Sequence, residues 1–181
     1  MALRSYYSRF FESDDLPLMR RWLEMPHIRE WWGEPDVELG YVRDMIEGRD
    51  STRPFIFSVD GVPTGYIQYW FIGDHQNDTW IADYPWLAEL PSDAVGVDLL
   101  IGDPAKLSQG IGSAALSGFA EHLVEDHPTI IIDPDPTNRR AVRAYEKAGF
   151  RPIPRLLGRT GDTLIMQYDP QYDPNETETK Q

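Results

Sequence analysis

Five stretches of the chain place hydrophobic residues three or four positions apart, which predicts amphipathic helices. The first opens on an acidic cap and a proline in its first turn, and glycines end the second and the fifth. The predicted helices cover residues 14–25, 26–33, 37–48, 110–126 and 139–148. Alternating or wholly apolar runs predict strands at 3–10, 55–59, 65–72, 94–102 and 129–132, with a closing pair at 151–157 and 163–168.

The order of these elements indicates how the strands pair. The turn 60–63 joins its two flanking strands into a hairpin, and the strand at 3–10 is expected at a sheet edge. A helix separates the strands at 94–102 and 129–132, so these two are expected to be parallel. In the second hairpin strand, one face carries Tyr66, Gln68 and Trp70.

The segment 73–93 is long for a loop and is both acidic and aromatic. Loops of this length in compact domains are often functional, and carboxylates beside aromatic rings suit a polycationic molecule. A solvated loop with a few anchoring rings explains the composition equally well. If the loop binds a ligand, its candidate partners for ammonium groups are Asp78 and Asp83.

Composition narrows the class of protein. The 181 residues predict a single domain over 1–170, followed by a polar tail at 171–181 that we expect to be disordered. The net charge of −13 argues against nucleic acid and anionic membranes and favours a cationic partner, although it also serves simple solubility. There is no cysteine, the four histidines are scattered, and no signal-peptide core is visible; we expect no metal and a cytoplasmic location.

Two neighbouring features suggest chemistry. Asp98 interrupts an apolar strand, where a lone carboxylate needs either a partner or a task; a structural aspartate bonded to backbone remains the alternative. A glycine turn at 109–112 then opens a long helix, and unpaired amides at a helix start suit a phosphate. Together these features predict a phosphorylated cofactor beside an acid or a base.

The order of elements and two motifs resemble the GCN5-related N-acetyltransferase (GNAT) family. The motifs are Gln109-Gly-Ile-Gly112 and Asn138-Arg-Arg-Ala-Val-Arg-Ala-Tyr-Glu-Lys-Ala-Gly-Phe150. Leu107 departs from the Arg or Gln with which the family often starts its turn. The resemblance implies an α/β (α+β) GNAT fold, with a mixed, mostly antiparallel sheet, a splayed parallel strand pair and flanking helices.

Within the family, Glu30-Trp-Trp-Gly33, Gly65-Tyr-Ile-Gln68 and the segment from Gly96 to Gly102 are similar to aminoglycoside 6′-N-acetyltransferases, as is Asp133-Pro-x-Pro-x-Asn138. Siderophore-type lysine acyltransferases share the Trp-rich segment but typically carry His at position 98. The resemblance therefore favours acetyl transfer from acetyl-CoA to the 6′-amine of an aminoglycoside, by direct transfer in a ternary complex. Alternatives are another amine (a siderophore precursor, a polyamine or a protein N-terminus) and a non-catalytic acyl-CoA-binding module.

The resemblance also implies roles for individual residues. Asp98 would accept or relay the amine proton or orient the amine, and Tyr145 would protonate the leaving thiolate, unless it is only a packed helix residue. The substrate would contact Trp32, Tyr66, Asp78, Asp83, Asp98 and Asp133, although both tryptophans of the Trp31-Trp32 pair can equally be core. Asn138 is also a plausible helix cap. The cofactor would contact Leu99, Leu100, Ile101, Gln109, Gly110, Ile111, Gly112, Ser113, Asn138, Ala141 and Tyr145. We expect a monomer or a weak homodimer.

Overall fold

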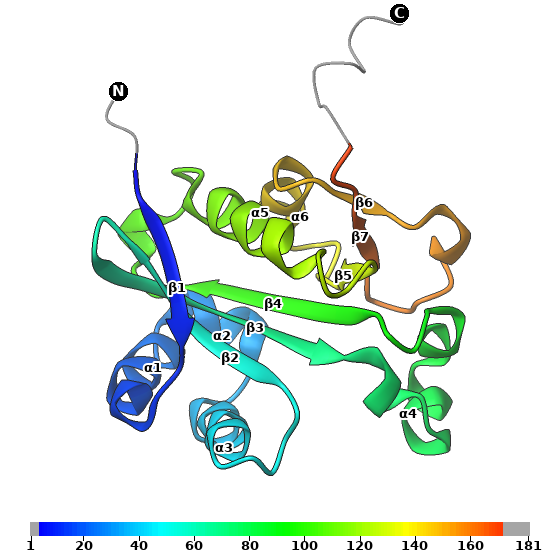
Figure 1. Cartoon of the computed structure of the whole chain (residues 1–181), viewed down its shortest axis with the longest axis horizontal. Coiled ribbons are helices and arrows are strands. Elements are labelled where there is room, and N and C mark those ends of the chain that lie inside the picture. The colour runs from blue at the N-terminus through cyan, green and yellow to red at the C-terminus, as the bar shows by residue number, and fades with distance from the viewer. Residues whose placement is uncertain (1–3, 172–181) are drawn as a thin grey trace, which may run out of the picture. The chain divides into compact units, whose positions relative to one another are not determined.

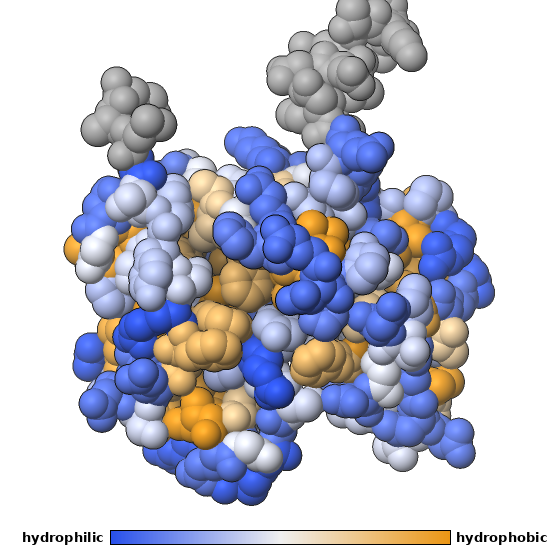
Figure 2. Space-filling view, in the orientation of Figure 1, coloured by the Kyte–Doolittle hydropathy of each residue, from blue (hydrophilic) through white to orange (hydrophobic). Residues whose placement is uncertain are grey.

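The computed structural model describes residues 4–171, so the predicted tail lies almost wholly outside the described residues. The chain divides into two compact units. Among the described residues, the N-terminal unit comprises 4–70 and 98–115, and the C-terminal unit 71–97 and 116–171. Within the described range, no helix has the length and apolar character that crossing a bilayer requires. The face shown in Figure 2 mixes hydrophilic and hydrophobic residues.

The strands of the N-terminal unit are β1 (Tyr6–Phe10), β2 (Arg53–Val59), β3 (Val62–Phe71) and the second half of β4 (Val95–Ile101). β1 and β2 are antiparallel, as are β2 and β3, with a bulge between Phe57 and Ser58. The hairpin turn is only Asp60-Gly61, both with positive φ, as a two-residue turn requires. The predicted turn at 60–63 is therefore too long, since Val62 and Pro63 already pair with β2.

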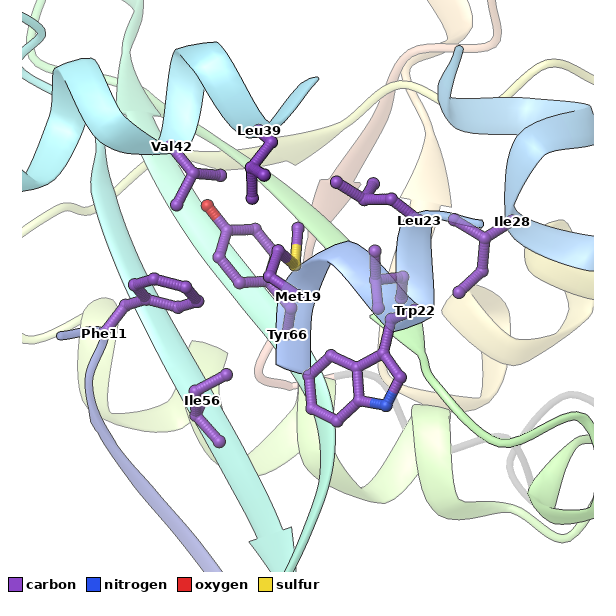
Figure 3. Packing of buried hydrophobic residues seen from close by; sticks show 10 residues of the cluster. Phe11, Met19, Trp22, Leu23, Ile28, Leu39, Val42, Ile56 and Tyr66 are labelled. Atoms are coloured by element: carbon purple, nitrogen blue, oxygen red, sulfur yellow. The ribbon is translucent and has the colours of Figure 1, made fainter. Parts of the chain in front are cut away.

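Three helices pack on one face of these strands: α1 (Leu16–Leu23), α2 (Pro26–Trp32) and α3 (Pro35–Ile46) (Figure 1). A short 3-10 turn, η1 (Ser13–Asp15), leads into α1. Their buried side chains meet the sheet around Tyr66, whose ring lies among side chains of α1 and α3 (Figure 3). The cluster confirms the amphipathic patterns and contains Phe11, Met19, Trp22, Leu23, Ile28, Leu39, Val42, Ile56, Tyr66 and Leu100.

In the C-terminal unit, the first half of β4 lies parallel to β5 (Ile130–Ile132), which confirms the predicted parallel pair. β7 (Met166–Tyr168) is antiparallel to β5, and β6 (Phe150–Pro152) is antiparallel to β7. The strand order is β1-β2-β3-β4-β5-β7-β6. Both closing strands are shorter than predicted, and β6 is soon followed by a 3-10 turn, η5 (Pro154–Leu156).

Two further helices follow β4 in the sequence, joined to it by the 3-10 turn η4 (Pro104–Lys106). α5 (Ile111–Leu123) begins in the N-terminal unit and continues in the C-terminal unit. α6 (Arg139–Lys147) is capped at its start by Asn138 and is followed by Gly149 with a positive φ, as the sequence predicts.

The prediction that residues 73–93 form a loop is wrong, because most of the segment is helical. It contains η2 (Ile72–His75), α4 (Asp78–Asp83) and η3 (Pro85–Glu89). Local polar groups build these short turns: the Asn77 side chain caps α4, and the Gln76 amide donates to the carbonyls of Leu87 (2.8 Å) and Leu90 (2.9 Å). Hydrophobic periodicity cannot reveal helices that depend on such local bonds.

Candidate active site

Asp98 lies on the second half of β4, opposite Gln68 of β3. The Gln68 amide nitrogen donates to the Asp98 carboxylate at 2.8 Å, and the Gln68 amide oxygen accepts from the Tyr66 hydroxyl at 2.6 Å. Trp70 also donates a side-chain hydrogen bond to Asp98. Tyr66, Gln68 and Trp70 therefore share one face of β3, as predicted, and all three belong to a network that holds the Asp98 carboxylate.

Burial raises the pKa of Asp98 above its ordinary value, even though the donors Gln68 and Trp70 favour the charged form. The raised pKa makes this carboxylate a stronger base than an exposed aspartate. The two donors also fix its orientation. A half-buried carboxylate of raised pKa with fixed geometry suits proton acceptance or the orientation of a cation.

The prediction that Tyr66 packs against a sugar ring needs correction. Its side chain has 0% exposed surface and lies inside the hydrophobic cluster, so its ring is not accessible to a ligand. Burial, Asp98, Glu38 and Asp50 all raise the pKa of the Tyr66 hydroxyl, which therefore stays neutral. Tyr66 is a positioning residue: its hydroxyl holds Gln68, and Gln68 holds Asp98.

The tryptophan pair divides as one of the two interpretations predicts. Trp32 is half-buried and meets Tyr66 edge-on at 5.9 Å between ring centroids, whereas Trp31 is exposed. Trp32 thus adjoins the network around Asp98 and keeps part of its surface available. Its contact with a substrate stays a prediction.

The sequence analysis missed Glu38. This half-buried residue of α3 lies against Gly33, where a Cβ would come within 3.2 Å of a Glu38 carboxylate oxygen. Burial and the nearby Asp98 raise the pKa of Glu38 to about 7. The available signal was its position one turn before Val42 on the apolar side of α3, an unusual place for an acid. The N-terminal unit therefore contains two neighbouring carboxylates with raised pKa values.

The glycine turn before α5 has the geometry of an anion site. Ser108 and Gly110 both have positive φ, and the first helical bond runs from the Ala114 amide to the Gly110 carbonyl. The preceding amides, at 111–113, therefore have no intrahelical acceptor. Gln109 and Gly110 are exposed, and the Ser113 hydroxyl donates to the Gly110 carbonyl. Amides at the positive end of a helix dipole fit a phosphate.

Two cations in the same unit lie next to this turn, and the sequence analysis did not single them out. The Arg4 guanidinium donates to the Gln109 side-chain oxygen at 3.0 Å. Lys106, in η4, donates to the Thr64 hydroxyl at 3.2 Å. The chain has a net charge of −13, and Leu107 adds no positive charge to the turn. Arg4 and Lys106 therefore supply local positive charge that would favour an anion.

The side chains that follow Asp98 alternate across the sheet. Leu100 belongs to the cluster beneath α1–α3. Leu99 and Ile101 lie on the opposite face, under the start of α5, where a Cβ on Gly112 would meet them at 3.5 and 3.4 Å. The Ile101 carbonyl already binds the His27 ring at 2.9 Å. β4 therefore carries Asp98 on one face and supports the glycine turn on the other.

The remaining candidates lie in the C-terminal unit. Asn138 accepts from the Ala141 amide at 3.2 Å, so its role as a helix cap is confirmed. Tyr145 is half-buried on α6, and Asp133, also half-buried, directly follows β5. Asp78 and Asp83 are exposed at the two ends of α4. Contacts of these residues with a cofactor or a substrate stay predictions.

Comparison with known proteins identifies the family. The family model of the GNAT acetyltransferase domain matches residues 12–156. The aminoglycoside N(6′)-acetyltransferase type 1 of Klebsiella pneumoniae is 32% identical over 151 residues, covering 78% of this chain and 72% of the relative. The kanamycin resistance protein of Rhizobium radiobacter is 36% identical over 67 residues, covering 36% of this chain and 62% of that protein.

A solved structure, aminoglycoside acetyltransferase AAC(6′)-Ib in complex with coenzyme A, superposes with a TM-score of 0.75 at 31% identity, covering 92% of this chain and 96% of that one. The complex of AAC(6′)-Ib with coenzyme A and kanamycin gives 0.73 at 29% identity, with the same coverage. The family model over residues 12–156 and the similarity to these solved structures lead to one conclusion: this chain belongs to the GNAT family of acetyltransferases.

Proposed function

We propose that this protein is an aminoglycoside 6′-N-acetyltransferase, which transfers an acetyl group from acetyl-CoA directly to the 6′-amine within a ternary complex. The observation that carries the proposal is the Asp98 carboxylate, held by Gln68 and Trp70 on a strand whose other face supports a glycine turn with the geometry of an anion site. The named activity of the 32% identical relatives and the AAC(6′)-Ib complexes support it.

The start of α5 fits the pyrophosphate of acetyl-CoA, which brings the acetyl group as a reactive thioester. Exposed Gln109 and Gly110 and the amides of Ile111, Gly112 and Ser113 would bind it, with Arg4 adding a positive charge beside Gln109. Backbone groups of Leu99, Leu100 and Ile101 would bind the amides of the pantetheine arm and orient the carbonyl. Asn138 and Ala141 would contact the same arm.

Asp98 would bind the 6′-ammonium and take or relay its proton, because only the neutral amine can attack a carbonyl. Its raised pKa improves the driving force for this transfer, and the bonds from Gln68 and Trp70 direct the carboxylate. As the C–S bond breaks, Tyr145 would donate its hydroxyl proton to the departing thiolate. Orientation of the amine contributes in addition, since it converts a bimolecular encounter into a step within one complex.

The remaining ammonium and ring contacts would come from acidic and aromatic residues. Asp133, Asp78 and Asp83 would bind further ammonium groups, and the accessible part of Trp32 would pack against a sugar ring. The net charge of −13 would attract the polycationic antibiotic over distances of about a Debye length. We expect the reaction to take place in the cytoplasm.

A thiol-release assay tests the proposal directly. Purified protein with acetyl-CoA should release thiol on addition of kanamycin, and mass spectrometry should find one added acetyl group on the 6′-nitrogen. An aminoglycoside with a 6′-hydroxyl in place of the amine is the matched control and should give no turnover. Equal release with both compounds would contradict the regiochemistry. Release only with polyamines or lysine derivatives would assign the protein to another substrate class.

A further inference from the structure

Glu38 occupies a place where an acidic side chain is costly. It lies on the side of α3 that packs on the sheet, on the same stripe as buried Val42 and as Met45, whose sulfur is 3.6 Å from the Tyr66 hydroxyl. Its carboxylate approaches Gly33 at the end of α2. The Glu38 charge also acts on the Tyr66 hydroxyl, and Tyr66 in turn meets Trp32 edge-on.

The Glu38 carboxylate also has no partner within the described residues: the side chain makes neither a hydrogen bond nor an ion pair there. Neighbouring acids on the same helices and turns differ in this respect. Asp36, two residues earlier, is paired with Arg20 at 2.5 Å, and Glu34 is paired with Arg29 at 3.3 Å. A half-buried carboxylate left unpaired is destabilising unless a ligand supplies the missing charge.

Within the described residues, the charged group that acts on Glu38 is another acid. Asp98 of β4 repels the Glu38 charge, and both of these, together with Asp50, act on Tyr66 of β3. Burial is the larger cause of the raised Glu38 pKa, which is about 7. Each of these two carboxylates makes it more costly to charge the other, and a bound cation would lower that cost.

We propose that Glu38 is a substrate-specificity residue that binds an ammonium group of the amine substrate next to the one bound by Asp98, and so selects substrates carrying more than one positive charge. This inference rests on the proposed function and deepens it. It explains why an acid occupies the apolar side of α3.

The proposal predicts proton release on binding. Near pH 7, Glu38 with a pKa of about 7 is about half protonated, and an ammonium group beside it lowers that pKa. Substrate binding should therefore expel up to about half a proton from this side chain. Titration calorimetry of kanamycin, in two buffers of different ionisation enthalpy at pH 7, measures this number without requiring turnover.

Glu38→Gln is the test variant and Asp36→Asn the matched control, since both remove one negative charge from α3 and Asp36 is exposed. Glu38→Gln should weaken kanamycin binding roughly tenfold, the size expected for a charged hydrogen bond, and should reduce the proton release. Affinity for acetyl-CoA should not change. Asp36→Asn should bind kanamycin within about twofold of the parent protein.

The possible outcomes distinguish the role of Glu38 from the proposed function. Unchanged kanamycin affinity and unchanged proton release in Glu38→Gln would overturn the role of Glu38 while leaving the proposed function intact. Binding by the parent protein without acetyl transfer would refute the proposed function alone, and no binding at all would refute both. Glu38→Asp keeps the charge and should restore most of the proton release, which a misfolded variant would not.

Discussion

Two acidic side chains of the N-terminal unit lie in opposite electrostatic environments. Asp15, in η1, is 8% exposed and forms two 2.7 Å bonds with the Arg9 guanidinium, which lower its pKa. Glu38, on α3, is half-buried and has no partner among the described residues, and its pKa is raised to about 7. The fold therefore stabilises the charged form of Asp15 and destabilises the charged form of Glu38.

An acid that is paired within the protein, such as Asp15, stabilises the fold, whereas an acid without a cation beside it can bind a charged ligand. Arg9 already satisfies Asp15, which also accepts from the Glu12 amide and so fixes the start of the first helix. Glu38 and Asp98 together have raised pKa values and no cation from the described chain beside them. Such perturbed groups are more common at functional sites than at structural ones.

The largest effect is expected from Asp98→Asn, which removes the charge but keeps the shape. Loss of the proton acceptor should lower kcat for 6′-acetylation by about 10²- to 10³-fold. Acetyl-CoA affinity and the unfolding temperature should stay close to those of the parent protein. Steady-state kinetics together with a thermal scan measure both. A matching loss of acetyl-CoA binding would mean that Asp98 is structural, like Asp15.

Asp15→Ala should affect stability instead of catalysis. It leaves Arg9 without its partner and should cost about 1–3 kcal/mol of unfolding free energy at pH 7, less than for a fully buried pair because Arg9 is partly exposed. The folded pKa of Asp15 is depressed, so this contribution is present above its unfolded value near 3.8 and is lost as pH falls through the folded pKa. Chemical denaturation at pH 7 and pH 3 should show the difference shrinking.

For this variant, kcat per folded molecule should equal that of the parent protein. A fall in kcat with unchanged stability would show that Asp15 acts in catalysis and is not a structural acid.

Glu38→Gln should raise the free energy of unfolding, whereas Asp15→Ala lowers it. The folded pKa of about 7 lies above the ordinary 4.5, so the ionised form opposes folding, and the penalty grows as pH rises from 4.5 through 7. Discounted for solvent screening, the variant should be about 1–2 kcal/mol more stable than the parent at pH 8 and equal to it at pH 4. Denaturation curves at the two pH values measure this. Lower stability of Glu38→Gln at pH 8 would show that Glu38 has a partner that stabilises it.

The smallest effect is expected from Tyr66→Phe, which removes the hydroxyl that holds Gln68. The variant should lose about 1 kcal/mol of stability and reduce kcat only several-fold, because Gln68 and Trp70 still contact Asp98. The KM for acetyl-CoA should not move. A loss of kcat as large as that of Asp98→Asn would give Tyr66 a direct role, which its buried ring does not suggest.

Sequence patterns predicted the features of this fold that follow from regular periodicity. The amphipathic helices, the parallel pair of β4 and β5 and the cap at Asn138 each depend on residues close in sequence or on one strict alternation. Asp98 was identifiable because a carboxylate in an apolar strand is rare. The helical turns at 72–89 were missed because they depend on side-chain bonds such as those of Gln76.

The site was predicted less completely for a physical reason. Whether Tyr66 faces a ligand or the core depends on how three helices cover the sheet, which alternation alone does not specify. Glu38 looks like an ordinary helix acid until its position above Gly33 and near Asp98 is known. Burial and the identity of spatial neighbours set the pKa of a carboxylate, and both are properties of the tertiary structure.

The most direct test of these contrasting environments is an NMR titration of the side-chain carboxyl carbons in protein labelled with ¹³C at Asp and Glu. We expect Glu38 to titrate near pH 7, Asp98 above pH 3.8 and Asp15 below pH 3.8. Addition of kanamycin should shift the Glu38 midpoint to lower pH. A Glu38 midpoint near the ordinary 4.5, unmoved by kanamycin, would contradict the account.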